Sequence, residues 1–86
     1  MDSSAIEALL KEKLDIDEAY AKTDGSHVEV IVVGSVFENM SRVKKQQMIY
    51  GPLNPSIADG SIHAVSIKTF TPEEWERDKK LILPDA

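Results

Sequence analysis

Two histidines, His27 and His63, are the strongest candidates for metal ligands in this 86-residue sequence, which contains no cysteine. Two imidazoles and one carboxylate are acceptable ligands for zinc. Neither histidine belongs to an H-x-x-x-H spacing, so a zinc site has little support from the residues alone. Two structural roles stay open: His63 as a partly buried side chain satisfied by backbone hydrogen bonds, and His27 as a polar residue at the end of a hairpin.

A basic stretch in an acidic chain is the second candidate site. The net charge is −5, yet the segment from Met40 to Leu53 holds three cations, Arg42, Lys44 and Lys45, and no anion. Three interpretations are open: the solvated face of a helix, a nucleic-acid surface, or a docking surface for a partner protein. The negative net charge opposes non-specific binding to nucleic-acid phosphates. At a docking surface, the basic residues would guide the approach and orientation of the partner protein.

Other classes of function find little support. The sequence has no cysteine nucleophile, no glycine-rich phosphate loop and no serine motif with a base at a recognisable spacing, so we expect no enzyme activity. No apolar run approaches the roughly 18–20 residues of a membrane span, and the first residues lack the basic region of a secretory signal. We expect one cytoplasmic domain over residues 1–86, with an ordered core at about 4–80, monomeric alone or weakly dimeric.

Turn and capping signals divide the chain into elements that position these residues. Ser4 with Glu7 and Thr71 with Glu74 have the spacing of capping boxes, which begin helices. Asp24-Gly25 predicts a hairpin turn. The predicted helices cover residues 4–14, 41–50 and 71–80, with a single helical turn at 54–60, and the predicted strands cover 18–23, 27–33 and 62–70. The last residues, "LILPDA", are expected to form a tail that frays beyond Leu83.

The second helix is predicted to end early. Tyr50 is followed by Gly51 and Pro52, and glycine just past a helix with proline beyond it is a common helix end. The resulting order is α-β-β-α-α-β-α, an α+β fold with a three-stranded mixed sheet. A helical crossover makes the last two strands parallel. His27 and His63 therefore begin their strands at the same end of the sheet.

A longer pattern resembles a known family. The segments "GSHVEVIVVGSVFENMSRVKKQQMIYGPL" and "IHAVSIKTFTPEEW" are similar to the BolA family, closest to its short-loop bacterial branch, the IbaG proteins. The resemblance runs from Ser4 to about Lys80, and the order and spacing of the segments carry it. It implies a fold like the type II KH domain, and partnership with a monothiol glutaredoxin around a shared [2Fe-2S] cluster. It also links the chain to stress responses and DNA binding.

The resemblance assigns roles to the histidines. His63 stands where the family has a cluster ligand, which makes it the firmer candidate. The family's second ligand lies in the hairpin loop, which here reads "TDGS" and has neither histidine nor cysteine, so His27 is a tentative second ligand and Asp24 an alternative. A [2Fe-2S] cluster needs four donors, mainly thiolates. The chain alone should therefore bind no cluster, and a glutaredoxin cysteine and glutathione would supply the sulfur.

The resemblance to KH domains helps to judge whether the basic stretch binds nucleic acid. KH domains clamp single strands with a GXXG loop, whereas the corresponding segment here reads "GPLN" and keeps only Gly51. We therefore predict a partner of monothiol glutaredoxin in iron–sulfur cluster handling or in iron- and stress-linked regulation. Arg42, Lys44, Lys45 and Tyr50 are the predicted docking residues. The alternative is a nucleic-acid-binding transcriptional regulator with a degenerate KH-like fold.

Overall fold

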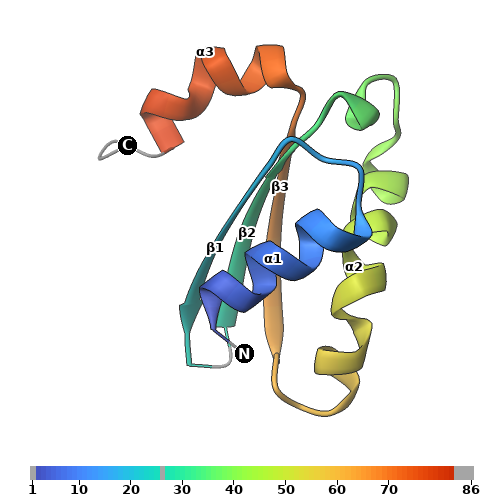
Figure 1. The fold of residues 1–86 in the computed structure, drawn as a ribbon, viewed down its shortest axis with the longest axis vertical. Coiled ribbons are helices and arrows are strands. Elements are labelled where there is room, and N and C mark those ends of the chain that lie inside the picture. The colour runs from blue at the N-terminus through green and yellow to red at the C-terminus, as the bar shows by residue number, and fades with distance from the viewer. Residues whose placement is uncertain (1, 26, 83–86) are drawn as a thin grey trace.

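The computed structural model describes residues 2–25 and 27–82, and the tail predicted beyond Leu83 lies outside them. Three strands, three α-helices and one short 3-10 helix follow one another along these residues (Figure 1). Their bounds are α1 Ser3–Lys13, β1 Glu18–Asp24, β2 His27–Val33, η1 Ser35–Phe37, α2 Arg42–Ala58, β3 Ala64–Phe70 and α3 Pro72–Ile82.

The strands form the predicted mixed sheet, in the order β1-β2-β3. β1 and β2 are antiparallel, and Asp24 pairs with His27 beside the turn. Gly25 has a φ of 63° there, a conformation that glycine adopts at low cost. β2 and β3 are parallel, with His27 opposite Ala64. The run "HVEVIVV" forms β2 over the predicted residues because its β-branched side chains pack well on a sheet, where all five of them are buried.

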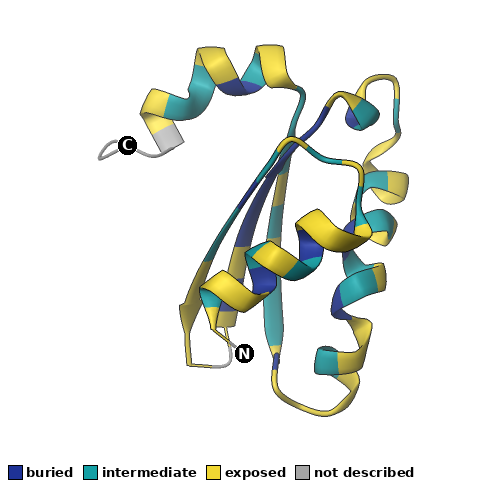
Figure 2. Ribbon diagram, in the orientation of Figure 1, coloured by how far each residue is buried: buried dark blue, intermediate teal, exposed yellow. Residues whose placement is uncertain are grey.

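Helices pack on both faces of this sheet, and the second face is covered only in part. α1 and α2 pack on the face formed by Val28, Val30 and Val32, where the main core lies (Figure 2). On the opposite face, α3 packs over Ile31 and Val33, whereas His27 and Glu29 on that face stay exposed. Side chains alternate between the faces along each strand, so β2 contributes to both layers.

Trp75 fixes α3 to the sheet. Its side chain is only 3% exposed, and its ring lies 5.4 Å from the ring centroids of both Tyr20 and Phe70. The Tyr20 hydroxyl donates a hydrogen bond to Glu18. That bond, together with burial, raises the pKa of Tyr20 to about 12. The prediction that Trp75 anchors the last helix is confirmed.

The predicted break in the second helix is wrong. α2 runs without interruption through Pro52 and Pro55, and no separate turn follows it. A proline inside a helix costs about 3 kcal/mol because it removes a backbone hydrogen bond. Ile49 and Leu53, both fully buried, lie on either side of Pro52, and burying two such side chains contributes about 1.5–3 kcal/mol each. Packing against the sheet therefore outweighs the local helix-ending signal.

The start of α1 also differs from the prediction. Asp2, not Ser4, caps the helix, and its Oδ1 accepts a hydrogen bond from the Ala5 amide at 2.8 Å. Glu7, expected to complete a capping box with Ser4, instead accepts a 2.8 Å hydrogen bond from the Ala21 amide on β1. A side chain expected to act locally thus links α1 to an edge of the sheet.

The capping box of α3 is present as predicted. The Thr71 amide donates to Glu74 at 2.8 Å, and the Glu74 amide donates to the Thr71 hydroxyl at 3.3 Å. The bond from the Thr71 amide holds the pKa of the Glu74 carboxyl below its usual value. A lowered pKa in the folded state means that ionised Glu74 stabilises the fold, and that protonation removes this contribution.

We therefore expect Glu74→Gln to destabilise the protein at pH 7 and to have a smaller effect in acid. The contribution is complete above the ordinary glutamate pKa and is lost as the pH falls through the lowered one, so the difference should shrink below about pH 4.5. Urea unfolding at pH 7 and pH 3 measures it. As a control, Glu73→Gln removes a charge from the same turn and leaves both hydrogen bonds of the capping box in place. An equal pH dependence in that control would contradict the assignment.

Candidate functional site

The structure brings His27 and His63 to the same end of the sheet, as the parallel pairing predicted. His27 is the first residue of β2 and lies opposite Ala64, the residue that directly follows His63. Neighbouring strands are about 4.8 Å apart, so the backbones of the two histidines lie near each other at this end of the sheet. Both are exposed. The predicted third strand began at Ile62, whereas β3 begins at Ala64, so His63 lies in the loop just before it.

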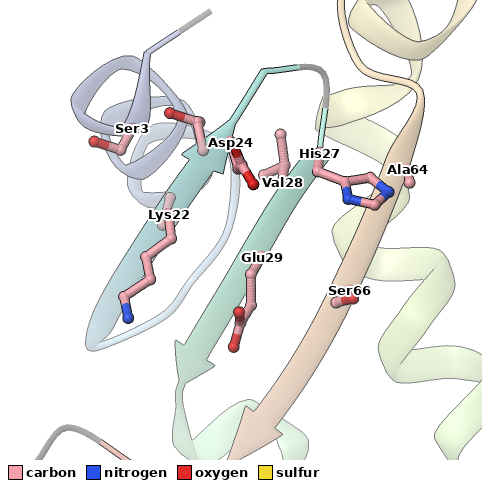
Figure 3. A pocket seen from close by; sticks show the side chains of 10 residues that line it. Ser3, Lys22, Asp24, His27, Val28, Glu29, Ala64 and Ser66 are labelled. Carbon is pink, nitrogen blue, oxygen red and sulfur yellow. The ribbon is translucent and has the colours of Figure 1, made fainter.

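An open depression of about 540 Å³ lies beside this end of the sheet and includes His27 in its lining. In Figure 3 the imidazole of His27 extends toward Ala64 on β3, with Glu29 farther along β2 and with Lys22 and Asp24 on β1. His63 does not line this depression. Its Nε2 lies 3.9 Å from where a Cβ on Gly60 would be, so its ring reaches toward the loop that follows α2.

These residues supply too few donors for a metal centre of their own. Within residues 2–25 and 27–82, no group of three or more histidine, cysteine, aspartate or glutamate side chains is placed to hold a metal ion. The chain also has no thiolate. A metal centre that included His27 or His63 would need further donors from another molecule. The zinc site considered from the sequence lacks the required third ligand among the described residues.

The predicted basic residues separate into two groups. Arg42 and Lys45 line a groove of about 310 Å³ between the first turns of α2 and the end of β3, together with Gln46 and Lys68. Lys44 is exposed but does not line the groove, and Tyr50 lies farther along α2 and is half-buried. Lys68 was missed from the sequence. A lysine within a strand is typical of an exposed sheet edge, which was the signal available for it.

The histidines and the groove lie at opposite ends of β3. The groove is lined by residues Ile67 to Phe70, whereas His63 precedes the first residue of the strand. At about 3.3 Å per residue, the two sites are separated by roughly 15–20 Å. α2 runs beside β3 in the opposite direction, with its basic first turns beside the end of the strand (Figure 1). A single partner that contacts both sites must therefore cover most of this side of the molecule.

Comparison with known sequences identifies the family. A family profile described as BolA, BolA-like protein, matches residues 5–74. The chain belongs to the BolA family. The acid stress protein IbaG of Escherichia coli strain K12 is 54% identical over 81 residues, which cover 94% of this chain and 96% of that protein. BolA proteins are not enzymes, so the prediction that the chain has no enzyme activity is confirmed.

Solved BolA structures share the fold. A BolA homologue from Coxiella burnetii superposes with a TM-score of 0.71 at 31% identity, covering 90% of this chain and 99% of that one. Mouse BolA1 superposes with a TM-score of 0.78 at 26% identity, covering 90% of this chain and 70% of that one. The predicted α+β fold is confirmed. Among the described residues, no helix has the length and apolar character needed to span a membrane.

Proposed function

We propose that this BolA protein binds a monothiol glutaredoxin and contributes histidine ligands to a [2Fe-2S] cluster at their interface. The observation that carries the proposal is the exposed pair His27 and His63 at one end of the sheet, in a chain with no thiolate. Imidazole replaces thiolate in known [2Fe-2S] centres, where the other donors are sulfur. A glutaredoxin cysteine and its bound glutathione have the chemistry that this chain lacks.

His63 has the firmer ligand role and His27 the second. His63 lies in the loop before β3, where its exposed ring is accessible to a partner. His27 projects from β2 at the same end, and Asp24, its neighbour across the hairpin, is the alternative donor. Each imidazole must be deprotonated to bind a metal, so acid should weaken this interaction. The relative named acid stress protein IbaG fits a role in stress-linked regulation.

Arg42, Lys44, Lys45 and Tyr50 remain candidate docking residues for the glutaredoxin. The groove is separated from the histidines along β3. The docking residues would therefore contribute to the orientation of the glutaredoxin and to its rate of association, and not to cluster ligation. The chain has a net charge of −5, so the protein as a whole repels acidic surfaces. These cations would therefore attract an acidic partner only locally, where they lie.

The test is reconstitution with and without the partner. Alone, the purified protein should stay colourless after treatment with iron and sulfide, because two imidazoles cannot hold a cluster. Mixed with a glutathione-loaded, cluster-bearing monothiol glutaredoxin, it should form a mixed complex with a new visible circular dichroism spectrum. A brown protein without the partner, or a mixture whose spectrum equals that of glutaredoxin alone, would contradict the proposal.

A further inference from the structure

The two edge strands of the sheet differ in whether their outward backbone groups are hydrogen bonded. At the β1 edge, the Ala21 amide donates to the Glu7 carboxylate, so α1 occupies part of that edge. At the β3 edge, the amide of Gly34 donates to the Phe70 carbonyl, which directs the peptide groups of Phe70 toward β2. Because peptide groups alternate along a strand, those of Ile67 and Thr69 point away from the sheet.

No residue in the described part of the chain hydrogen bonds with these outward groups of Ile67 and Thr69. They line the groove of about 310 Å³ between β3 and α2. Each offers one donor and one acceptor, spaced along the edge as another strand would require. This edge is therefore open to strand pairing, whereas the β1 edge is partly closed by Glu7.

Cations lie on both sides of this edge. Lys68 projects on the side of the sheet that α3 covers, because it pairs with Ile31. Arg42 and Lys45 approach from α2, which packs on the other side. Glu74 is close enough to Lys45 for that charge to lower the Glu74 pKa. Arg42, Lys45 and Lys68 form no ion pair with a described residue. Of these, Arg42 and Lys68 lie on opposite sides of the edge and are available to a ligand.

We propose that this groove binds an extended acidic segment of a partner protein, which adds to the sheet as a fourth strand beside β3. The backbone of the segment would pair with the outward groups of Ile67 and Thr69, and its acidic side chains would meet Lys68 on one face and Arg42 on the other. Strand addition at a sheet edge is a recurring mode of peptide recognition, in which the backbone gives affinity and the side chains specificity.

A second copy of the chain fits the groove less well. Pairing β3 with β3 would bring the same cations, Lys68 and Arg42, of two copies together, and like charges oppose association. Nucleic acid bound through its phosphates also fits less well, because phosphate oxygens only accept hydrogen bonds and would not pair with the outward carbonyls of Ile67 and Thr69. An acidic peptide satisfies the donors, the acceptors and the charges.

The test uses the protein alone and a blocked peptide with the order threonine, glutamate, glutamate, valine, glutamate, glutamate, threonine, which places acids on both faces of a strand. Titration into isotope-labelled protein should shift amide signals of β3 and the first turns of α2, and should slow hydrogen exchange at Ile67 and Thr69. The same peptide methylated on two adjacent central amides loses a donor from each edge and should bind about three- to tenfold more weakly.

Charge and edge variants separate the contributions. Arg42→Glu with Lys68→Glu should weaken peptide binding at least roughly tenfold, whereas Lys11→Glu with Lys13→Glu makes the same charge change on α1 and should leave it nearly unchanged. Thr69→Pro removes one outward amide at an edge position that tolerates proline, and should weaken binding while retaining the salt dependence.

Three outcomes would overturn the proposal. One is equal binding of the methylated and unmethylated peptides, and another is an equal loss in the α1 control. The third is tighter binding of short single-stranded DNA at physiological salt without protection of Ile67 and Thr69, which would mark the groove as a phosphate surface. No glutaredoxin or cluster is present in these experiments, so their result is independent of the proposed function.

Discussion

Phe37→Ala is expected to destabilise the protein by about 3–5 kcal/mol, a large fraction of the total stability of a small domain. Phe37 is the largest fully buried side chain and is 1% exposed. It projects from η1 into the main core, between the helices and the sheet. Its loss leaves a cavity in the main core. Urea unfolding followed by far-ultraviolet circular dichroism and by the fluorescence of Trp75 measures the change.

Two further variants make this result specific. Phe37→Leu keeps most of the apolar volume and should cost much less, about 1–1.5 kcal/mol. Val43→Ala removes a side chain that is 63% exposed and should change stability by no more than about 0.5 kcal/mol. A loss below about 1 kcal/mol for Phe37→Ala would show that η1 is not part of the cooperative core. Divergence of the two probes would show that α3 unfolds separately.

The importance of Phe37 could not be predicted from the sequence, for a physical reason. Val36 and Phe37 are adjacent, so they match neither the two-residue period of a strand nor the spacing of a helix. The segment is shaped by backbone features instead. Asn39 has a φ of 63°, and a Cβ on Gly34 would lie 3.3 Å from Ile16. Such close approaches between distant segments leave no periodic signal in the sequence.

The strands and the last helix could be predicted because their signals agree with their tertiary contacts. The β-branched side chains of β2 are buried in the two core clusters of the sheet, where such side chains pack well. Asp24-Gly25 forms the turn, and Thr71 with Glu74 caps α3. In α2 the local and tertiary signals conflict, and burial of Ile49 and Leu53 continues the helix through Pro52. The order of elements was therefore more predictable than the helix ends.

The candidate sites could be predicted only where the strand pairing determines which residues lie together. The helical crossover predicts parallel pairing of the last two strands, which puts His27 and His63 at one end of the sheet, as observed. The basic residues followed no such rule, because a position within a helix does not determine which neighbour its side chain faces. Only Arg42 and Lys45 of the three predicted cations line the groove, and Lys68 joins them from β3. Tyr50 is half-buried and lies outside its lining.

His63→Ala is expected to remove the spectral change that accompanies the mixed complex with glutaredoxin. Neutral imidazole donates less charge than thiolate, and replacing thiolates by histidine raises the reduction potential of a [2Fe-2S] centre. The mixed complex of the wild-type protein should therefore have a higher potential than the glutaredoxin alone. Without the His63 ring, the cluster should keep only the sulfur ligands of the glutaredoxin. The visible circular dichroism and the reduction potential should then equal those of the glutaredoxin alone.

His27→Ala is the matched variant, because His27 begins the neighbouring strand at the same end of the sheet and is also exposed. It should weaken the mixed complex or leave a labile cluster, since Asp24 lies directly across the hairpin as a substitute donor. His27→Ala combined with Asp24→Asn should then resemble His63→Ala. Unfolding measurements on all variants separate loss of a ligand from loss of the fold. A full mixed-complex spectrum in His63→Ala would make His63 a structural residue, and equal effects of the two histidine variants would remove the distinction between firm and tentative ligand.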